Sequence, residues 1–388
     1  MDRYVIGLVG AFGSGCTYIA KNFIANNGYH YLSLSDILRD LYLEENGLCP
    51  EESLERKVMQ DYGNQIRLVK GNNYLAQKAV EKIEESSWTN IVVDSFRNPN
   101  EIEYFKSKFI EFDLIGIFSD KDIRWNRVKN KYDENEGLFN KDEKRDKGED
   151  IENGQRVTDC FLLADVIIAN NIVISGENDA FTLMKTKINQ YIDLLRNGAK
   201  GRRPTEIEAI MTMAYANSQR SSCLKRKVGA VIVDGEGNIF SSGYNEVPPL
   251  EKPCKNECGQ CYRSKFKNEI EDALQDAGIL TEPKKVIMKK IKVLEKCRAL
   301  HAEENAILNV ARFGSASAIK NGTLYTTTYP CNLCANKIAK VGLRKVIYLE
   351  PYPVEEAKQT LSAAKIEQEA FEGITYNSYF KVYCEIIL

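Results

Sequence analysis

The sequence has few histidines, no long apolar run and almost no net charge. Only His30 and His301 are present, so a metal site that uses histidine has two candidates. No stretch reaches about 18 consecutive apolar residues, which excludes a membrane-spanning helix. The formal net charge of −2 argues against a globally basic nucleic-acid binder. The first residues lack the apolar region of a signal peptide, so we expect a cytoplasmic protein with no membrane partner.

Apolar residues and cysteines, in contrast, are plentiful. The hydrophobic content of 43% is enough for sizeable cores and excludes global disorder, and 388 residues predict two or three domains. Eleven cysteines in a cytoplasmic chain argue against a disulfide framework. Seven of them fall between Cys254 and Cys384, in closely spaced groups, and this clustering indicates metal binding before redox chemistry.

Short apolar strands alternate with helical stretches in the first half of the chain. Strands expected at 4–9, 90–96, 112–119 and 164–171 predict a parallel sheet that is covered on both faces. Segment 196–204 contains two glycines, a proline and four basic residues, which is typical of a linker. The second half is also α/β but has a different element order. We therefore expect an α/β protein with two domains, 1–198 and 199–388.

The strongest motif combines His301-Ala302-Glu303 with Pro330-Cys331-Asn332-Leu333-Cys334, and this combination is the signature of zinc deaminases. Two cysteines three residues apart in the first turn of a helix point the same way, and His301 supplies a third ligand. Three protein ligands leave the fourth zinc position for water, and Glu303 is then the catalytic proton shuttle. The alternative is a structural zinc site, but such sites usually have four Cys or His ligands, and only three are nearby.

Residues 205–350 resemble the deoxycytidylate deaminase family. The matching stretches are 220–223, 227–233, 242–245, 301–307 and 330–335. The resemblance implies a cytidine-deaminase-like α/β/α domain in which Asn245 contacts the nucleotide sugar, whereas the alternative is an ordinary turn residue. It places Ser222, Lys225 and Arg226 near the phosphate, and Tyr329 could stack on the base. Glu246 stands where the family usually has glycine.

A second group of cysteines precedes His301. The resemblance implies a second, structural zinc in this region, and four thiolates suit a closed tetrahedral site. We expect its ligands to be Cys254, Cys258, Cys261 and Cys297. The alternative is a set of unrelated reduced cysteines.

Residues 10–17, GAFGSGCT, follow an apolar strand and open a helix, which is the context of a phosphate-binding loop (P-loop). Cys16 occupies the position of the usual lysine, so the charge that reaches the β- and γ-phosphates is absent. Backbone N–H groups could still hold a nucleotide, and Mg²⁺ could bind at Thr17 and Asp94. The nucleotide-site candidates are Gly10, Gly13, Ser14, Gly15, Cys16, Thr17 and Asp94.

Residues 93–101 resemble a stretch of dephospho-CoA-kinase-like and adenylate-kinase-like proteins. This resemblance implies a P-loop kinase-like parallel-sheet domain. Arg124 and Arg127 then lie where lid arginines occur, or else they belong to a solvated helix face. The domain could bind a regulatory nucleotide, could be a kinase with a compensating lysine, or could hold a purely structural loop. The missing lysine favours regulation.

Together, the two halves resemble the two-domain bacterial anti-phage deaminases of the AvcD type. This resemblance implies deamination of dCTP and dCMP to dUTP and dUMP, depletion of dCTP as antiviral defence, and restraint by a small RNA. Deaminases of this family commonly form homo-oligomers, either dimers or hexamers. The preference between dCMP and dCTP stays open.

Two other functions remain open. A deaminase acting on cytosine or adenine in RNA or single-stranded DNA would need a basic channel and stacking aromatic residues. A nucleotide or RNA sensor with a vestigial deaminase fold would not need an intact zinc motif.

Overall fold

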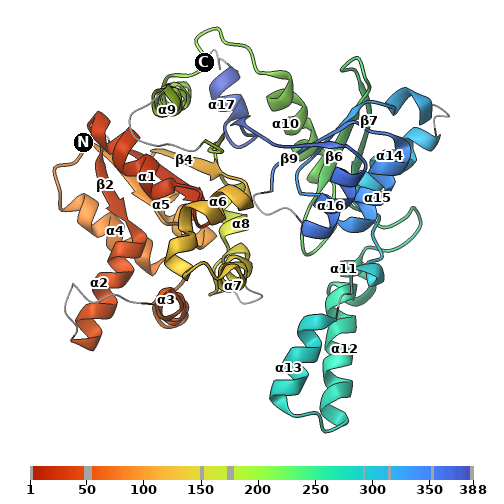
Figure 1. Ribbon diagram of the computed structural model, residues 1–388, viewed down its shortest axis with the longest axis horizontal. Helices are drawn as coiled ribbons and strands as arrows, with labels where there is room; N and C mark the ends of the chain where they lie inside the picture. The colour runs from red at the N-terminus through yellow and green to blue at the C-terminus, as the bar shows by residue number, and fades with distance from the viewer. Residues whose placement is uncertain are drawn as a thin grey trace. The chain divides into compact units, whose positions relative to one another are not determined.

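The computed structural model describes residues 3–47, 55–148, 153–172, 179–291, 293–312, 316–350 and 354–384. The chain divides into two compact units, each built on one sheet (Figure 1). The first unit comprises Met1–Ala209, Glu350–Tyr352 and Ala370–Leu388, and the second comprises Ile210–Leu349 and Pro353–Glu369. The sequence predicted one boundary, at 198/199. The structural units differ from that division chiefly because residues 370–388 belong to the first unit.

The first unit has a six-stranded sheet of order β11-β5-β4-β1-β3-β2. Its strands are β1 (Tyr4–Gly10), β2 (His30–Ser33), β3 (Asn90–Asp94), β4 (Glu111–Phe118), β5 (Val166–Ala169) and β11 (Gly373–Ile374). The pairings among β1 to β5 are parallel, which confirms the predicted parallel sheet, and only β11 is antiparallel. The four predicted strands are β1, β3, β4 and β5, whereas β2 and β11 were not expected.

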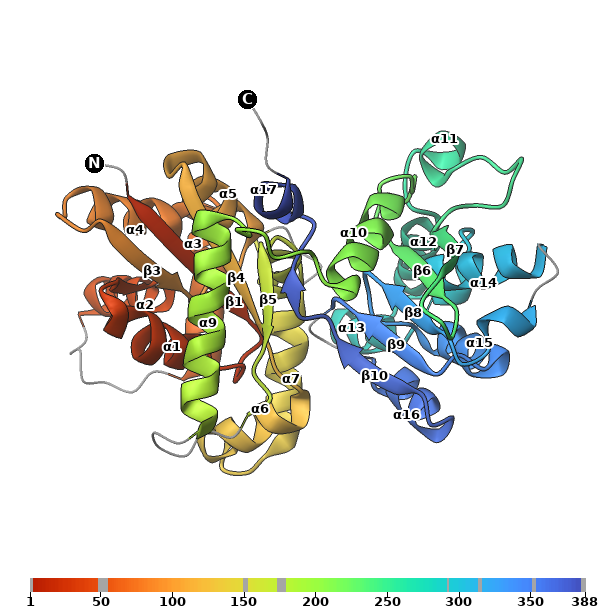
Figure 2. The same cartoon turned by 90° about the horizontal axis from the view of Figure 1, so that it is seen from above.

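Helices cover both faces of this sheet. Ile6, Leu8 and Ile117 share a buried cluster with Phe23 and with the inner face of α9, whose position across the strands is visible in Figure 2. The helical segments of the unit are α1 (Cys16–Ile19), η1 (Ala20–Ile24), η2 (Ala25–Asn27), α2 (Leu34–Asn46), α3 (Arg56–Lys70), α4 (Tyr74–Glu84), α5 (Pro99–Lys108), α6 (Lys121–Val128), η3 (Lys129–Tyr132), α7 (Glu136–Lys147), α8 (Val157–Leu162), α9 (Asp179–Asn197) and α17 (Tyr379–Tyr383). None of the helices in the described residues is long and apolar enough to cross a membrane.

The second unit has a five-stranded sheet of order β10-β9-β8-β6-β7. Its strands are β6 (Gly229–Val233), β7 (Ile239–Tyr244), β8 (Thr323–Thr326), β9 (Lys345–Tyr348) and β10 (Glu367–Ala370). Gly243 lets α14 approach β7 closely, because a Cβ there would lie 2.3 Å from the carbonyl oxygen of Ala302. Its helices are α10 (Glu206–Ser218, which starts in the first unit), α11 (Cys254–Cys258), α12 (Tyr262–Asp276), α13 (Thr281–Lys290), η4 (Leu294–Lys296), α14 (Ala302–Arg312), η5 (Ala316–Ile319), α15 (Asn332–Val341) and α16 (Glu355–Ala363).

The C-terminal segment 370–384 returns to the first unit. In β11, Gly373 and Ile374 pair with Ile167 and Val166 of β5. A fully buried carboxylate, Glu208, accepts hydrogen bonds from the Ile374 N–H at 2.9 Å and from the Tyr383 hydroxyl at 2.7 Å. The sheet of the first unit therefore receives its last strand from the far end of the chain.

Candidate functional site

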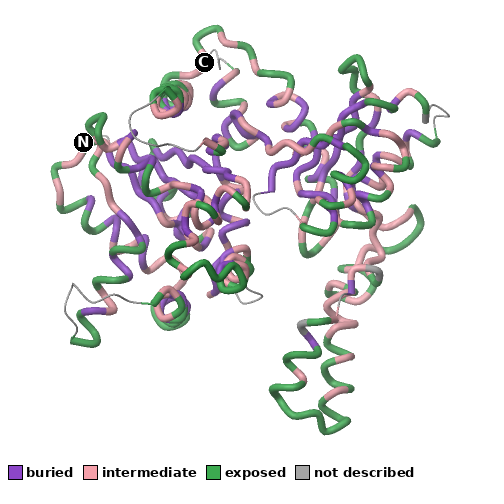
Figure 3. The backbone as a smooth tube through the Cα atoms, viewed as in Figure 1, coloured by how far each residue is buried: buried purple, intermediate pink, exposed green. Residues whose placement is uncertain are grey.

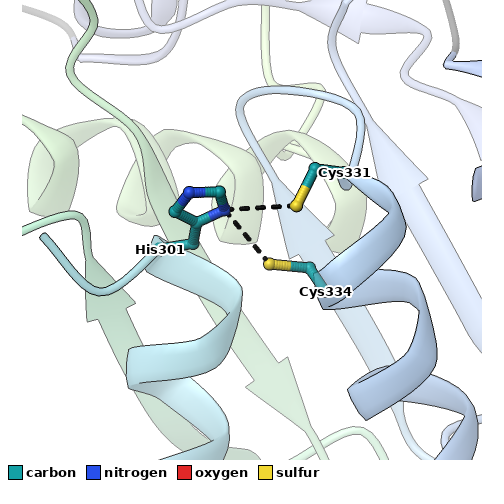
Figure 4. A group of neighbouring side chains, drawn as sticks. All are labelled: His301, Cys331 and Cys334. Carbon is teal, nitrogen blue, oxygen red and sulfur yellow. Dashed lines mark hydrogen bonds between the residues drawn. The ribbon is translucent and has the colours of Figure 1, made fainter. Parts of the chain in front are cut away.

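The residues of the zinc motif converge in the second unit (Figure 4). His301 immediately precedes α14, Cys331 is the residue before α15, and Cys334 lies in the first turn of α15. The Nδ1 atom of His301 is 3.3 Å from the Cys331 sulfur and 3.4 Å from the Cys334 sulfur. Among the described residues, only this group brings three Cys, His or carboxylate ligand atoms within 4.8 Å of one another.

Backbone geometry explains why the three ligands meet. The carbonyl oxygen of His301 accepts the first hydrogen bond of α14, from Asn305 N–H at 2.8 Å, and that of Cys331 does the same in α15, from Ala335 N–H at 2.8 Å. The Asn305 side chain also donates to the Tyr244 carbonyl oxygen at 3.0 Å, which ties α14 to the end of β7. Two helix starts are thus held side by side, each presenting a metal-binding side chain.

The thiols are already biased toward metal binding. The hydrogen bond from Cys334 lowers the pKa of Cys331 to about 4, and the neighbouring His301 ring acts in the same direction. The same contact raises the pKa of Cys334, as does burial. The two thiols together therefore lose one proton readily and retain the other. Because thiolate and imidazole are ligands that zinc prefers, the three side chains fit a zinc ion with one position left for another ligand.

Glu303 lies beside this group without being part of it. Its side chain is buried, with 2% exposure, and its carboxylate is 3.7 Å from the Cys334 sulfur, which donates to it. Burial raises the pKa of Glu303 to about 7. A carboxyl group with a pKa near neutrality can both accept and release a proton under physiological conditions, which is the property of a proton shuttle.

Two of the predicted substrate contacts, Asn245 and Tyr329, have partners within the protein. The Asn245 amide is satisfied by the backbone, because it accepts from Val228 N–H at 2.7 Å and donates to the Arg226 carbonyl oxygen at 2.9 Å. The Tyr329 ring is buried, with an edge-to-face contact to Tyr348 at a centroid distance of 4.7 Å, and its hydroxyl donates to Gln368. The contact of Asn245 and Tyr329 with a nucleotide stays a prediction.

The Glu246 carboxylate makes several hydrogen bonds, a role that was not predicted from the sequence. Its carboxylate accepts from the Ser222 hydroxyl at 2.6 Å, from Ser222 N–H at 3.0 Å and from Val247 N–H at 2.9 Å. Its backbone pairs with Leu300, the residue before His301. Ser222, predicted near the phosphate, is thus held by a negative charge that a glycine would not supply.

The second cysteine group gains a member that the spacing did not indicate. Cys223 joins Cys254, Cys261 and Cys297 around a small cavity of about 30 Å³. The thiol of Cys258, in contrast, lies 3.0 Å from the Gln260 carbonyl oxygen and does not line that cavity. Cys223 is distant in sequence from the other three, so only tertiary structure reveals it.

The P-loop segment forms a structured loop beside a cavity of about 620 Å³. Gly13 and Gly15 adopt φ angles of +83° and +96°, which favour glycine. Thr17 donates to Asp94 at 2.6 Å, so the two candidate magnesium ligands are adjacent. Burial raises the pKa of Cys16 to about 12, and this side chain therefore brings no charge to the loop.

Two arginines donate hydrogen bonds to the loop, and one of them, Arg127, also lines the cavity. Arg127 donates to the carbonyl oxygens of Gly13 at 3.3 Å, Asn170 at 2.9 Å and Ile172 at 2.7 Å. Arg124 is buried, donates to the Phe12 carbonyl oxygen at 3.1 Å and is paired with Glu143. Neither arginine belongs to a solvated helix face. Both orient the backbone of the loop.

Comparison with known proteins points to one family for the second unit. The model of the cytidine and deoxycytidylate deaminase zinc-binding region matches residues 204–350. The deoxycytidylate deaminase of Schizosaccharomyces pombe is 33% identical over 194 residues, which cover 50% of this chain and 51% of that protein. The deoxycytidylate deaminase of Enterobacteria phage T2 is 34% identical over 166 residues, covering 37% of this chain and 79% of that protein.

Among solved structures, the apo dCMP deaminase of cyanophage S-TIM5 is 26% identical, covers 44% of this chain and 100% of that chain, and has a TM-score of 0.30. The alignments span only about half or less of the two yeast relatives, 51% and 40% of their lengths. The likeness to the two yeast deaminases thus concerns only a part of each of them.

Proposed function

The chain belongs to the deoxycytidylate deaminase family, and from that premise we propose that it deaminates deoxycytidine nucleotides (dCTP, dCMP or both) by zinc-dependent hydrolysis. The observation that carries this proposal is the convergence of His301, Cys331 and Cys334 beside the buried carboxyl group of Glu303. Zinc, when bound by these three side chains, lowers the pKa of water toward neutrality. The net reaction replaces the C4 amino group of cytosine with oxygen from water and releases ammonia.

Glu303 has the position and the pKa for both proton transfers of this reaction. In the proposed sequence it takes a proton from the attacking water, passes it to the ring nitrogen beside C4, and later protonates the departing amino group. Burial keeps solvent from competing for that proton, since the side chain is only 2% exposed. Because the start of α14 is fixed next to His301, the Glu303 carboxylate two residues further along is also held in place.

The second cysteine group suits a structural zinc. The proposed ligands are Cys223, Cys254, Cys261 and Cys297, because these four line one cavity, and Cys258 is replaced by Cys223 in this set. No three of these sulfur atoms lie within 4.8 Å of one another in the described structure, so holding one ion requires the thiols to move closer together. Burial raises the pKa of Cys297, and the nearby thiols of Cys223 and Cys261 act in the same direction.

The first unit is proposed to be a P-loop kinase-like domain that binds a regulatory nucleotide. Support comes from the parallel sheet, from the glycine conformations at 13 and 15, and from the adjacent Thr17 and Asp94, which would hold Mg²⁺. The neutral Cys16 favours binding without phosphoryl transfer. The anti-phage role through dCTP depletion, restraint by a small RNA and assembly into homo-oligomers belong to the same proposal, on the resemblance to the AvcD-type deaminases.

A product assay on the purified protein tests the proposed function. The zinc-loaded chain, freed of bound RNA, is incubated separately with dCTP, dCMP, dCDP and CTP, and uracil nucleotides are separated by chromatography. Conversion of dCTP or dCMP that is lost in Glu303→Ala supports the proposal and gives the phosphate preference. Conversion only of cytosine or adenine in single-stranded DNA or RNA would replace it with a polynucleotide deaminase. No conversion of any substrate would favour a sensor.

A further inference from the structure

The P-loop cavity of the first unit contains an arginine near the position of the absent lysine. Arg97 lies between β3 and α5 and lines the cavity of about 620 Å³ together with loop residues 10–17. Its side chain is only 22% exposed. Burial raises the pKa of the Cys16 thiol, and the charge of Arg97 acts in the opposite direction, so the guanidinium group is close enough to influence that position. The loop therefore has a positive charge nearby although Cys16 itself brings none.

Two other cations line the same cavity, but both have other roles. Arg127 donates to backbone carbonyl oxygens, among them that of Ile172 at 2.7 Å. Lys131 is exposed and lies over the Phe12 ring, 5.9 Å from its centroid. Arg97 differs from both, because one of its partners is a carboxylate, which an incoming anion can replace.

That carboxylate belongs to Asp146, which is fully buried. The Nη1 atom of Arg97 donates to it at 3.3 Å, and Arg56 and Gln60 donate to it at 2.6 Å and 3.1 Å. Opposite charges attract more strongly where water is excluded, and a buried carboxylate that loses its cations is destabilising. The three donors thus form an anion-binding group, and the Asp146 carboxylate occupies it in this structure.

Asp146 is carried by α7, which ion pairs help to hold beside the loop. Asp142, one turn earlier in this helix, lies 3.3 Å from the Nε atom of Arg56. Arg56 also stacks over the Phe12 ring of the loop, with its guanidinium carbon 3.8 Å from the ring centroid. Only Phe139 and Asp146 are buried in α7, whose other residues are half-buried or exposed (Figure 3). An anion that takes over these arginines would therefore weaken the attachment of α7.

We propose that Arg97 takes the place of the missing lysine by binding the terminal phosphate of a nucleoside triphosphate, and that Asp146 competes with this phosphate for Arg97. The proposal rests on the nucleotide binding proposed for the first unit, and it adds the class of nucleotide and a means of regulation. Arg97 follows Asp94, a proposed magnesium ligand, by three residues, and Mg²⁺ in P-loop sites bridges the β- and γ-phosphates. A guanidinium group suits the outer phosphate because it can donate two parallel N–H bonds.

This competition makes α7 responsive to the nucleotide. A terminal phosphate carries more negative charge than one carboxylate, so a bound triphosphate draws Arg97 from Asp146 and loosens α7. A diphosphate lacks this group and leaves the ion pair in place. The attachment of α7 thus distinguishes the two nucleotides.

Calorimetric titration of the full chain with Mg-ATP, Mg-GTP and Mg-ADP tests the competition, and these purine nucleotides avoid the cytosine site proposed in the second unit. Asp146→Asn keeps the shape of the side chain but removes its charge. We expect its affinity for the triphosphates to rise at least tenfold and its affinity for Mg-ADP to change by less than threefold. Arg97→Gln/Asp146→Asn has the net charge of the wild type and should lose this gain.

The matched control is Asp61→Asn. Asp61 and Arg145 form another ion pair between α3 and α7, at 2.7 Å, and neither residue lines the cavity. If the gain in Asp146→Asn comes from Arg97 and not from a looser contact between the two helices, the affinities of Asp61→Asn should stay within twofold of the wild type.

Hydrogen–deuterium exchange provides a second readout. Mg-ATP should accelerate exchange in residues 136–147 of the wild type but not of Arg97→Gln, and this comparison decides the question if Asp146→Asn does not fold. Unchanged triphosphate affinity in Asp146→Asn, an equal gain for Mg-ADP, a gain that persists without Arg97, or unaltered exchange in the wild type overturns the inference while nucleotide binding stands. No binding of either triphosphate by the wild type or the variants overturns the nucleotide site itself, and the inference with it.

Discussion

Replacing Glu303 with glutamine should remove the activity of the protein and make its zinc-free form more stable. The glutamine side chain has nearly the same shape as the glutamate but cannot accept or release the proton. General acid–base groups contribute about 10²–10⁴-fold to rate, and Glu303 is proposed to act in every proton transfer of the reaction, so we expect a loss at the upper end of that range.

The stability gain follows from the buried carboxyl group. Burial raises the pKa of Glu303 from 4.5 to about 7 in the zinc-free protein, and at 1.36 kcal/mol per pKa unit this corresponds to about 3 kcal/mol. The folded pKa is the higher one, so the stability associated with the protonated group is present below pH 4.5 and is lost as pH rises through 7. Glutamine never ionises and therefore avoids this loss. At pH 5 the difference should shrink to below about 1 kcal/mol.

The assay compares both proteins after chelation of zinc, by denaturant unfolding at pH 8 and pH 5, with deamination measured on the zinc-loaded forms. Glu304→Gln is the matched control, because this neighbouring residue is partly exposed and pairs with Lys337 at 3.1 Å. It should keep activity within a few fold and change stability by less than about 1 kcal/mol. A Glu303→Gln protein that is inactive but has the same free energy of unfolding as the wild type at pH 8 would refute the inference that ionisation of the buried Glu303 carboxyl group destabilises the folded protein.

Three further predictions concern other parts of the chain. Zinc analysis by mass spectrometry should show one zinc fewer per chain in Cys223→Ser but not in Cys258→Ser. The reverse result would favour the ligand set predicted from the sequence, which contains Cys258 instead of Cys223. Cys16→Lys should bind Mg-ATP at least tenfold more tightly than the wild type, because it returns the absent charge to the loop, and titration calorimetry would reveal unchanged affinity if the loop is purely structural. Glu208→Gln should lower the free energy of unfolding by about 2–4 kcal/mol, since one of its buried oxygens becomes an N–H group facing donors such as the Tyr383 hydroxyl; an unaltered thermal midpoint would contradict this.

Local sequence was sufficient for the central strands and the zinc group. The runs that became β1, β3, β4 and β5 are mostly apolar, and a strand buried on both faces needs little else to be recognised. The zinc ligands were also predictable, because two of them lie within one helical turn and His301 stands two residues from Glu303. Short-range spacing determines both features.

Features that depend on distant segments escaped prediction. The two-residue strand β11 has no periodicity to detect, and its pairing with β5 depends on the fold of the whole first unit. Cys223 joins the second cysteine group only because β7 and the loop before β6 bring it there. In the sequence, Glu246 only replaces the glycine that is usual in the family. In the structure, its side chain holds Ser222 in place by accepting a hydrogen bond from the hydroxyl.

The return of segment 370–384 to the first unit has a consequence for synthesis on the ribosome. The sheet that contains β1 receives β11 only after the whole of the second unit in chain order, so the first unit cannot complete its fold while the second unit is still emerging. During that interval the edge of β5 is unpaired, and unpaired edges invite aggregation. Premature termination near residue 369 would therefore leave the second unit with its whole sequence but the first with an open edge.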